Sequence, residues 1–192
     1  MGSKSGTHAL LIGIGVVVGI CLVVCIAFIP RAFRELTHTR TFRMSGESME
    51  PTLYDGDVIT VDTSYYRNHP IADGDVIVFR HKEVVLVKRV SAVPGETIAG
   101  KDGKLFRNGA PVDEPYLRSP DEVPTTMEPS LDEWTFPARV VPRDQVFVTG
   151  DWRSRSLDSR AAEYAPVHTQ DVLGKVIYIY SSSHPGQAGR RF

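Results

Sequence analysis

The chain has 192 residues, of which 42% are hydrophobic and 23% charged, and a formal net charge of −1. This near balance of acidic and basic residues excludes the basic stripe that is typical of a nucleic-acid-binding domain. Both cysteines, Cys21 and Cys25, lie in one apolar segment, so the rest of the chain has no disulfide framework and must fold around a hydrophobic core.

The first element in the chain is an uncharged apolar segment from Ala9 to Ile29, which ends at Pro30 and Arg31. At about 1.5 Å per residue, a helix of this length crosses a hydrocarbon core of about 30 Å. A cleaved leader would have a shorter apolar core of about 7–15 residues that ends in small residues. The segment therefore predicts one retained transmembrane helix.

The charges beside this helix predict its orientation. Lys4 is the one Lys or Arg before the helix, whereas four arginines follow it closely, at Arg31, Arg34, Arg40 and Arg43. Because basic residues favour the cytoplasmic side, this pattern alone places the following domain in the cytoplasm.

The remainder of the chain is rich in β-strand patterns and contains no long segment with helical periodicity. Runs of β-branched and other apolar residues predict strands at 57–61, 75–79, 84–90, 105–106, 146–148 and 175–180. The short link from Arg80 to Glu83 predicts that the second and third of these runs pair with each other. The fold class is therefore mostly β, with coiled antiparallel sheets or a partly open barrel behind one N-terminal transmembrane helix.

Two stretches lack this pattern. Residues 118–137 are rich in proline and acidic residues, which predicts a long surface excursion outside the core. The residues after Ser181 are predicted to be a disordered tail.

Candidate chemistry begins with Ser48, in a glycine-containing turn, and Lys88, at the end of the apolar run 84–88. A serine hydroxyl needs a neighbouring base to act as a nucleophile, and the six histidines lie in no recognisable motif. The nucleophile motif G-x-S-x-G fails because Glu50 replaces its second glycine, and no metal-binding spacing is present. A lysine that is desolvated among apolar neighbours is the remaining base, because burial lowers its pKa. A solvated strand lysine and an ordinary turn serine are the competing interpretations.

Three segments favour the catalytic interpretation of Ser48 and Lys88, because they resemble the signature boxes of bacterial type I signal peptidases. They are Ser45–Leu53, then Lys88–Val90 with Pro94–Glu96, then Gly150–Arg160, in the expected order behind an N-terminal anchor. The resemblance implies a membrane-bound serine endopeptidase that removes signal peptides from secreted preproteins, with no cofactor and no metal. Its partners would be the preproteins and the lipid bilayer, and its place the outer face of the plasma membrane.

The same resemblance assigns roles to single residues. Ser48 would be the nucleophile and Lys88 the general base, with Ser156 orienting the lysine amine and Asp158 and Arg160 forming a supporting ion pair. Shallow apolar pockets for small substrate side chains would be lined by Met44, Met49, Leu53, Leu86 and Val87. Residues 1–30 would be a cytoplasmic tip and anchor, and residues 31–192 an extracytoplasmic peptidase domain with a variable excursion over about 101–145. This orientation conflicts with the one that the flanking arginines predict.

Two positions depart from the family pattern. Trp152 stands where the third box usually has asparagine, and Gly46 stands where some members carry a serine that helps to form the oxyanion hole. The oxyanion would then depend more on backbone N–H groups, including that of Ser48.

Two other classes of function remain open. An autoproteolytic regulator of the LexA kind resembles the same Ser–Lys core, and Ala99-Gly100 offers it a self-cleavage site. No helix-turn-helix pattern accompanies that site. A non-catalytic membrane-tethered interaction module would need neither Ser48 nor Lys88.

Overall fold

The structure is a computed structural model that describes residues 38–117, 135–161 and 164–192. The predicted transmembrane segment Ala9–Ile29 lies outside these residues, so its prediction stays open. Among the described residues, no helix combines the length and apolarity needed to cross a bilayer. The compact unit that contains the three boxes extends from Arg40 to Phe192.

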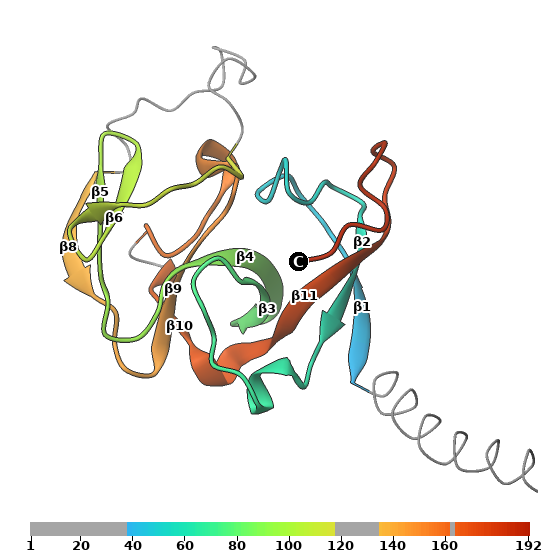
Figure 1. Ribbon diagram of the computed structural model, residues 1–192, viewed down its shortest axis with the longest axis horizontal. Helices are drawn as coiled ribbons and strands as arrows, with labels where there is room; N and C mark the ends of the chain where they lie inside the picture. Colours follow the sequence, from blue (N-terminus) through green and yellow to red (C-terminus); the bar gives the residue numbers. More distant parts are fainter. Residues whose placement is uncertain (1–37, 118–134, 162–163) are drawn as a thin grey trace, which may run out of the picture. The chain divides into compact units, whose positions relative to one another are not determined.

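This unit is built from antiparallel sheets, as predicted. The larger sheet has seven strands in the order β1-β2-β11-β3-β4-β9-β10, and the smaller has four in the order β7-β6-β5-β8 (Figure 1). The strands of the larger sheet are β1 (Thr39–Arg43), β2 (Val58–Asp62), β3 (Val76–His81), β4 (Val84–Ala92), β9 (Gln145–Thr149), β10 (Val167–His168) and β11 (Val172–Ser181). Those of the smaller sheet are β5 (Thr97–Lys101), β6 (Lys104–Arg107), β7 (Ala110–Pro111) and β8 (Phe136–Val140). Short 3-10 turns are η1 (Tyr65–Arg67), η4 (Arg153–Arg155) and η6 (Thr169–Asp171).

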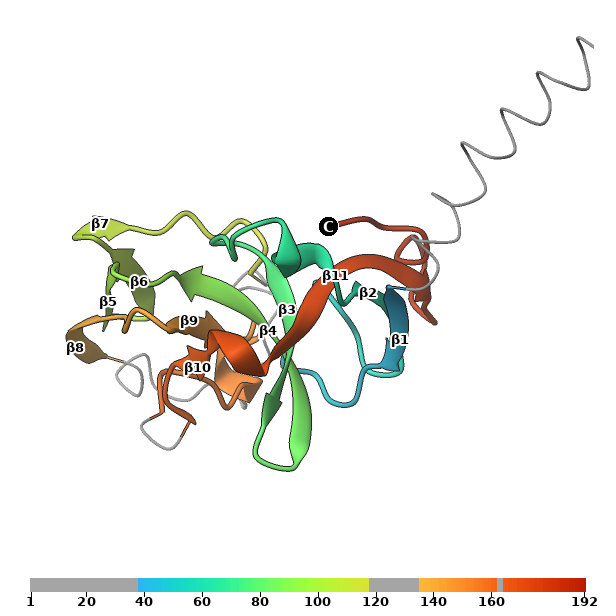
Figure 2. The same cartoon turned by 90° about the horizontal axis from the view of Figure 1, so that it is seen from below.

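The predicted strand runs are confirmed with small shifts at their ends. The predicted pairing of the second and third runs is also confirmed, because β3 and β4 form an antiparallel hairpin in which Ile77 lies opposite Lys88. This hairpin projects from the rest of the larger sheet (Figure 2). The short strands β1, β5, β7, β8 and β10 were not predicted.

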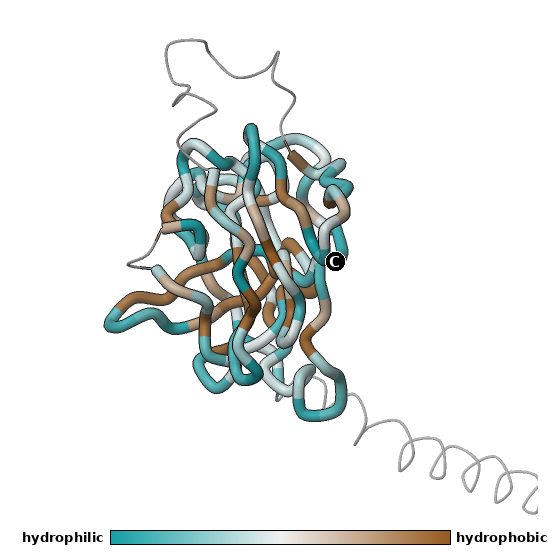
Figure 3. The backbone as a smooth tube through the Cα atoms, turned by 90° about the vertical axis from the view of Figure 1, so that its left-hand side faces the viewer, coloured by the Kyte–Doolittle hydropathy of each residue, from teal (hydrophilic) through white to brown (hydrophobic). Residues whose placement is uncertain are grey.

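Apolar residues concentrate along the strands and polar residues in the connecting turns (Figure 3). One buried cluster joins β2, β3 and β11 to Met44, Met49 and Leu53, and a second lies around Ile77 and Phe79 on the opposite face of β3. A third cluster packs the smaller sheet against the ends of β4 and β9, where Ala92 and Phe147 meet Ile98 and Leu105. Lys88 therefore lies on a strand that contributes to the core on both faces.

Two predictions about irregular segments need correction within the described residues; residues 118–134 of the predicted excursion lie outside them, so only its end at residues 135–137 is tested. Phe136, at the end of the predicted excursion, begins β8 and is buried, stacking on Phe147 with ring centroids 5.6 Å apart. The proline signal was misleading because β8 is an edge strand, where Pro137 needs no partner for a backbone N–H.

The tail after Ser181 is ordered against β11. Gly189 N donates to Ile179 O at 2.9 Å, and Phe192 N donates to Ile177 O at 3.2 Å. Gly186 and Gly189 have positive φ values of 77° and 91°, which let the chain turn back, and Phe192 then packs against the first core cluster.

Candidate active site

Ser48 lies on the turn between β1 and β2, and this turn is fixed by the core beneath it. Met49 and Leu53 are fully buried, and Leu53 N donates to Met49 O at 2.9 Å. Gly46, with φ of 93°, donates its N–H to Asp55 Oδ1 at 2.7 Å, which holds the other side of the turn. Ser48 itself is half-buried, so the turn presents its hydroxyl while the next residue anchors the backbone.

Lys88 reaches this hydroxyl from β4. Its side chain is almost fully buried, with the residue 3% exposed, and its Nζ lies 2.6 Å from Ser48 Oγ. An ammonium at this distance donates to the serine oxygen, whereas a neutral amine accepts the hydroxyl proton. The geometry therefore allows a proton to pass between the two groups.

The burial of Lys88 also sets its charge. The pKa of the Lys88 amine is lowered from 10.5 to about 8, chiefly by desolvation and to a smaller extent by the nearby Arg160 guanidinium. The carboxylates of Asp158 and Asp151 act in the opposite direction but are the weaker influence. A fraction of the molecules consequently carries a neutral lysine beside Ser48 near neutral pH, as the sequence-based argument required.

The third box closes over the same turn. Trp152 N donates to Ser48 O at 3.1 Å, which holds the carbonyl of the serine residue. Gly150 packs so tightly here that a Cβ at this position would lie 2.4 Å from Ser48 O and 2.2 Å from Ser156 Oγ. Glycine is thus required at position 150 for the box to approach Ser48.

Asp158 organises the rest of this box. It is buried and its carboxylate accepts from Gly150 N at 2.9 Å, Ser156 Oγ at 2.6 Å and Arg160 Nε at 2.8 Å. The predicted pair of Asp158 and Arg160 is therefore present. The contact of Ser156 differs from the expectation, because its hydroxyl donates to Asp158 instead of bonding to the Lys88 amine.

Arg89 is a residue whose role the sequence reasoning missed. It is buried and binds Asp151 through two contacts, at 2.9 Å from Nε and 2.7 Å from one terminal nitrogen. It also donates to Thr52 Oγ1 at 3.2 Å and to Gly74 O at 2.9 Å. Strand alternation from Lys88 places Arg89 on the other side of β4 but indicates no partner for it. Since Thr52, Arg89 and Asp151 come from the three different boxes, this guanidinium ties the boxes together.

The predicted substrate-contacting residues fall into two groups. Met44, Met49 and Leu53 are buried at 6%, 0% and 0% exposure in one core cluster, where they support the turn that carries Ser48; their contact with substrate stays a prediction. Leu86 and Val87 are half-buried next to Lys88 on β4, and they pack against different clusters because successive strand residues face opposite sides.

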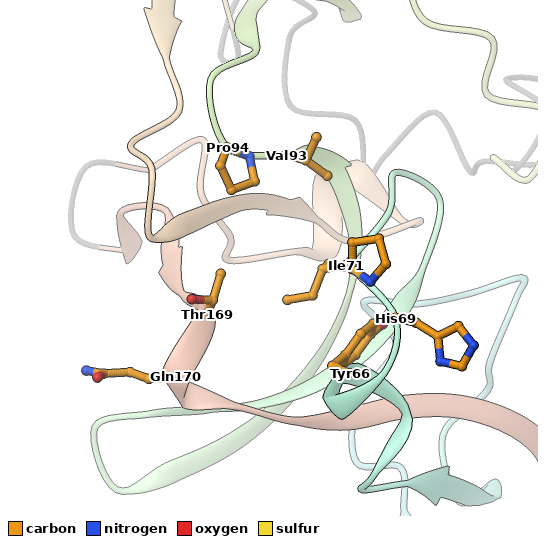
Figure 4. A pocket seen from close by; sticks show the side chains of 8 residues that line it. Tyr66, His69, Ile71, Val93, Pro94, Thr169 and Gln170 are labelled. Carbon is orange, nitrogen blue, oxygen red and sulfur yellow. The ribbon is translucent and has the colours of Figure 1, made fainter.

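In the part of the chain that the structure describes, four histidine rings have contacts with groups other than Ser48 and Lys88. These contacts are His69 on Tyr65, His81 on Tyr164, His168 with Asp144, and His184 on Tyr54. A cavity of about 580 Å³, drawn in Figure 4, has neither Ser48 nor Lys88 in its lining. It is lined by Tyr66, His69, Pro70, Ile71, Val93, Pro94, Thr169 and Gln170.

The family model and the similar proteins of known sequence all point to one family. The family model for signal peptidases, peptidase S26, matches residues 14–181. A probable signal peptidase I-1 of Synechocystis is 34% identical over 74% of this chain and 72% of its own length. Signal peptidase IB of Staphylococcus aureus is 32% identical over 84% of this chain and 86% of its own length. A solved signal peptidase I of Enterococcus faecalis is 31% identical, with a TM-score of 0.46 over 56% of this chain and 97% of that one.

The chain belongs to the signal peptidase family. It is accordingly a hydrolase of the serine endopeptidase class, and the family's activity is the removal of signal peptides.

The burial of Lys88 generates a stability prediction. In the unfolded chain the amine has its ordinary pKa, so between about pH 8 and 10.5 the unfolded state binds more protons and stability rises with pH. Replacing Lys88 by Met removes this penalty and keeps a side chain of similar shape. We expect the free energy of unfolding at pH 7 to rise by roughly 1–3 kcal/mol, with the gain shrinking towards pH 10.5. Urea unfolding at several pH values measures this difference. The exposed Lys104→Met is the matched control and should change little, and a Lys88→Met protein that is less stable at pH 7 would contradict a desolvated amine.

Proposed function

We propose that this chain is a membrane-bound endopeptidase that cleaves secreted preproteins with Ser48 as nucleophile and Lys88 as general base. The observation that carries the proposal is the 2.6 Å contact between Lys88 Nζ and Ser48 Oγ, made by an amine whose pKa burial lowers to about 8. Family membership supplies the substrate class, the signal peptide of a preprotein.

The chemistry follows from these two groups. Neutral Lys88 takes the hydroxyl proton as Ser48 Oγ bonds to the carbonyl carbon of the scissile peptide, and the carbonyl oxygen takes the negative charge. The backbone N–H of Ser48 is the proposed donor to that oxyanion. The lysine ammonium then gives its proton to the leaving amine, which breaks the peptide bond and leaves an acyl-enzyme. Lys88, neutral again, deprotonates the water that hydrolyses the ester and restores Ser48.

Ser156, Asp158 and Arg160 are proposed as support for this pair. Asp158 holds Gly150 N, whose residue packs against Ser48 O, so the carboxylate acts on the position of the nucleophile through the backbone. The negative charge of Asp158 favours the protonated form of Lys88. Arg160 partly balances this charge, because its Nε lies 2.8 Å from Asp158 Oδ1. Leu86 and Val87 flank the base on β4 and are the proposed lining for small substrate side chains.

The membrane anchor and the outward orientation belong to the same proposal. They are supported by the apolar segment Ala9–Ile29 and by the activity of the family, because cleavage sites of secreted preproteins emerge on the outer side. Arginines after the helix would then lie near anionic headgroups, where each contributes about 1 kcal/mol of attraction.

The two competing functions make different predictions at named positions. The self-cleavage bond Ala99-Gly100 of a LexA-like protein lies within β5, which is paired with β6 on one side and β8 on the other. A bond in the middle of a sheet is poorly available to an active-site serine, which favours a separate substrate. A non-catalytic module gives no reason to bury a lysine against a serine.

The dyad is tested by cleavage of a preprotein with mass spectrometry of the products. Ser48→Ala and Lys88→Ala should each abolish cleavage while the thermal unfolding temperature stays near or above that of the wild type. Lys88→Arg should also be inactive, because a guanidinium does not give up its proton in the pH range of the assay. Ser45→Ala, in the same turn, and Lys104→Ala, on β6, are controls that should cleave normally. Substantial cleavage by Lys88→Ala protein would rule out the lysine base, and a product cut at Ala99 would favour self-cleavage.

The orientation is tested with protease added to intact cells whose wall has been removed. We expect the domain to be degraded while a cytoplasmic marker protein stays protected. A domain that is degraded only after the membrane is broken would contradict the outward orientation.

A further inference from the structure

A segment outside the three boxes reaches two of their arginines. It follows β7 and comprises residues 112–117, and its Glu114 contacts Arg153 of η4. We propose that Glu114 and Tyr116 of this segment are positioning residues for the Ser48–Lys88 site. The proposal rests on the function argued above and extends it to residues that no sequence signal had singled out.

Glu114 forms a buried ion pair with Arg153. The side chains are 7% and 8% exposed, the carboxylate contacts both terminal nitrogens of the guanidinium, and the longer contact is 3.3 Å. Tyr116 adds a neutral donor, because its hydroxyl donates to Glu114 Oε1 at 2.8 Å. Burial beside the Glu114 carboxylate raises the pKa of the Tyr116 phenol, so this hydroxyl keeps its proton at any pH at which the enzyme works.

Arg153 carries this contact on to the nucleophile. Its Nε donates to Gly150 O at 2.9 Å, and its own carbonyl accepts from Arg160 at 2.6 Å. Gly150 in turn packs against Ser48 O, and Trp152 N donates to that same oxygen at 3.1 Å. Glu114 therefore holds the backbone of the third box through Arg153, and the same backbone contacts the Ser48 carbonyl.

Tyr116 provides a second connection through Arg89. The guanidinium carbon of Arg89 lies 3.9 Å from the centre of the Tyr116 ring, within the range of a cation–π contact. The same guanidinium binds Asp151 and Thr52, and Arg89 directly follows the base Lys88 on β4. The ring thus covers the arginine that joins the three boxes.

Positioning explains this arrangement better than stability does. A buried ion pair contributes little net stability compared with apolar residues of the same size, because desolvation offsets the attraction. Its fixed geometry, however, limits where Gly150 and Asp151 can lie. A displacement of about 1 Å at a catalytic group costs on the order of a hundredfold in rate, so small shifts of this backbone matter.

The test uses the full-length enzyme and a preprotein substrate. Glu114→Ala and Glu114→Gln should lower kcat by about ten- to a hundredfold with KM changed by less than about threefold. The midpoint of the pH profile of kcat/KM should stay at about 8, because Glu114 is not among the charges that act on Lys88. Tyr116→Phe keeps the ring on Arg89 and removes only the hydroxyl, so a smaller loss is expected. Asp144→Asn, which breaks the exposed pair with His168, is the control and should leave kcat unchanged.

A double-mutant cycle separates positioning from general stability. In an Arg153→Ala background, Glu114→Ala should cause no further loss of kcat, because the two side chains act as one unit. Wild-type kcat in Glu114→Gln and Tyr116→Phe, whether or not the unfolding temperature falls, would overturn the proposal, as would fully additive losses in the cycle. If Glu114→Ala does not fold, Glu114→Gln and Tyr116→Phe decide the question alone. Cleavage by Ser48→Ala would instead overturn the proposed function, so the two failures are distinguishable.

Discussion

The site depends on one unfavourable fact, the burial of the Lys88 amine beside a serine hydroxyl. An amine in water would hold its proton near neutral pH and could not act as a base, whereas desolvation lowers its pKa to about 8. That burial costs folding free energy, which the core clusters on both faces of β3 and β4 must offset. Stability and chemistry therefore oppose each other at this one residue, as is common at catalytic sites.

The remaining polar groups of the site hold this pair in place. Asp158 collects a backbone N–H, a hydroxyl and a guanidinium, and Arg89 connects Thr52 and Asp151 across the boxes. Three charges of the third box also act on the pKa of Lys88. The carboxylates of Asp158 and Asp151 favour the protonated amine, and the Arg160 guanidinium opposes them. The arrangement thus combines geometric support with partial cancellation of charge, which leaves desolvation as the dominant influence on the base.

The sequence was informative where local patterns decide structure. Runs of β-branched residues located six strands, and the ordered boxes led to Ser48 and Lys88 before any geometry was known. It failed where tertiary contacts override composition. Phe136 is buried because it packs on Phe147 in the third core cluster, and the edge position of β8 tolerates the adjacent Pro137. The C-terminal residues are ordered because they bond to β11 and Phe192 packs against the first core cluster. The roles of Arg89 and Glu114 depend on partners that are distant in the sequence. Asp151 lies 62 residues after Arg89, and Arg153 lies 39 residues after Glu114. Periodicity carries no information about such pairs, and the family resemblance that implied substrate contact for Met49 and Leu53 did not indicate how deeply the two side chains are buried.

The pH dependence of kcat/KM for a preprotein substrate tests the central claim most directly, because it reports the ionisation of the free enzyme. A base that must be neutral predicts a rate that rises with pH through a midpoint of about 8. Reagents that modify histidine should leave this rising limb in place. A midpoint near the ordinary lysine value of 10.5, or a limb that histidine modification abolishes, would contradict a desolvated Lys88 as the general base.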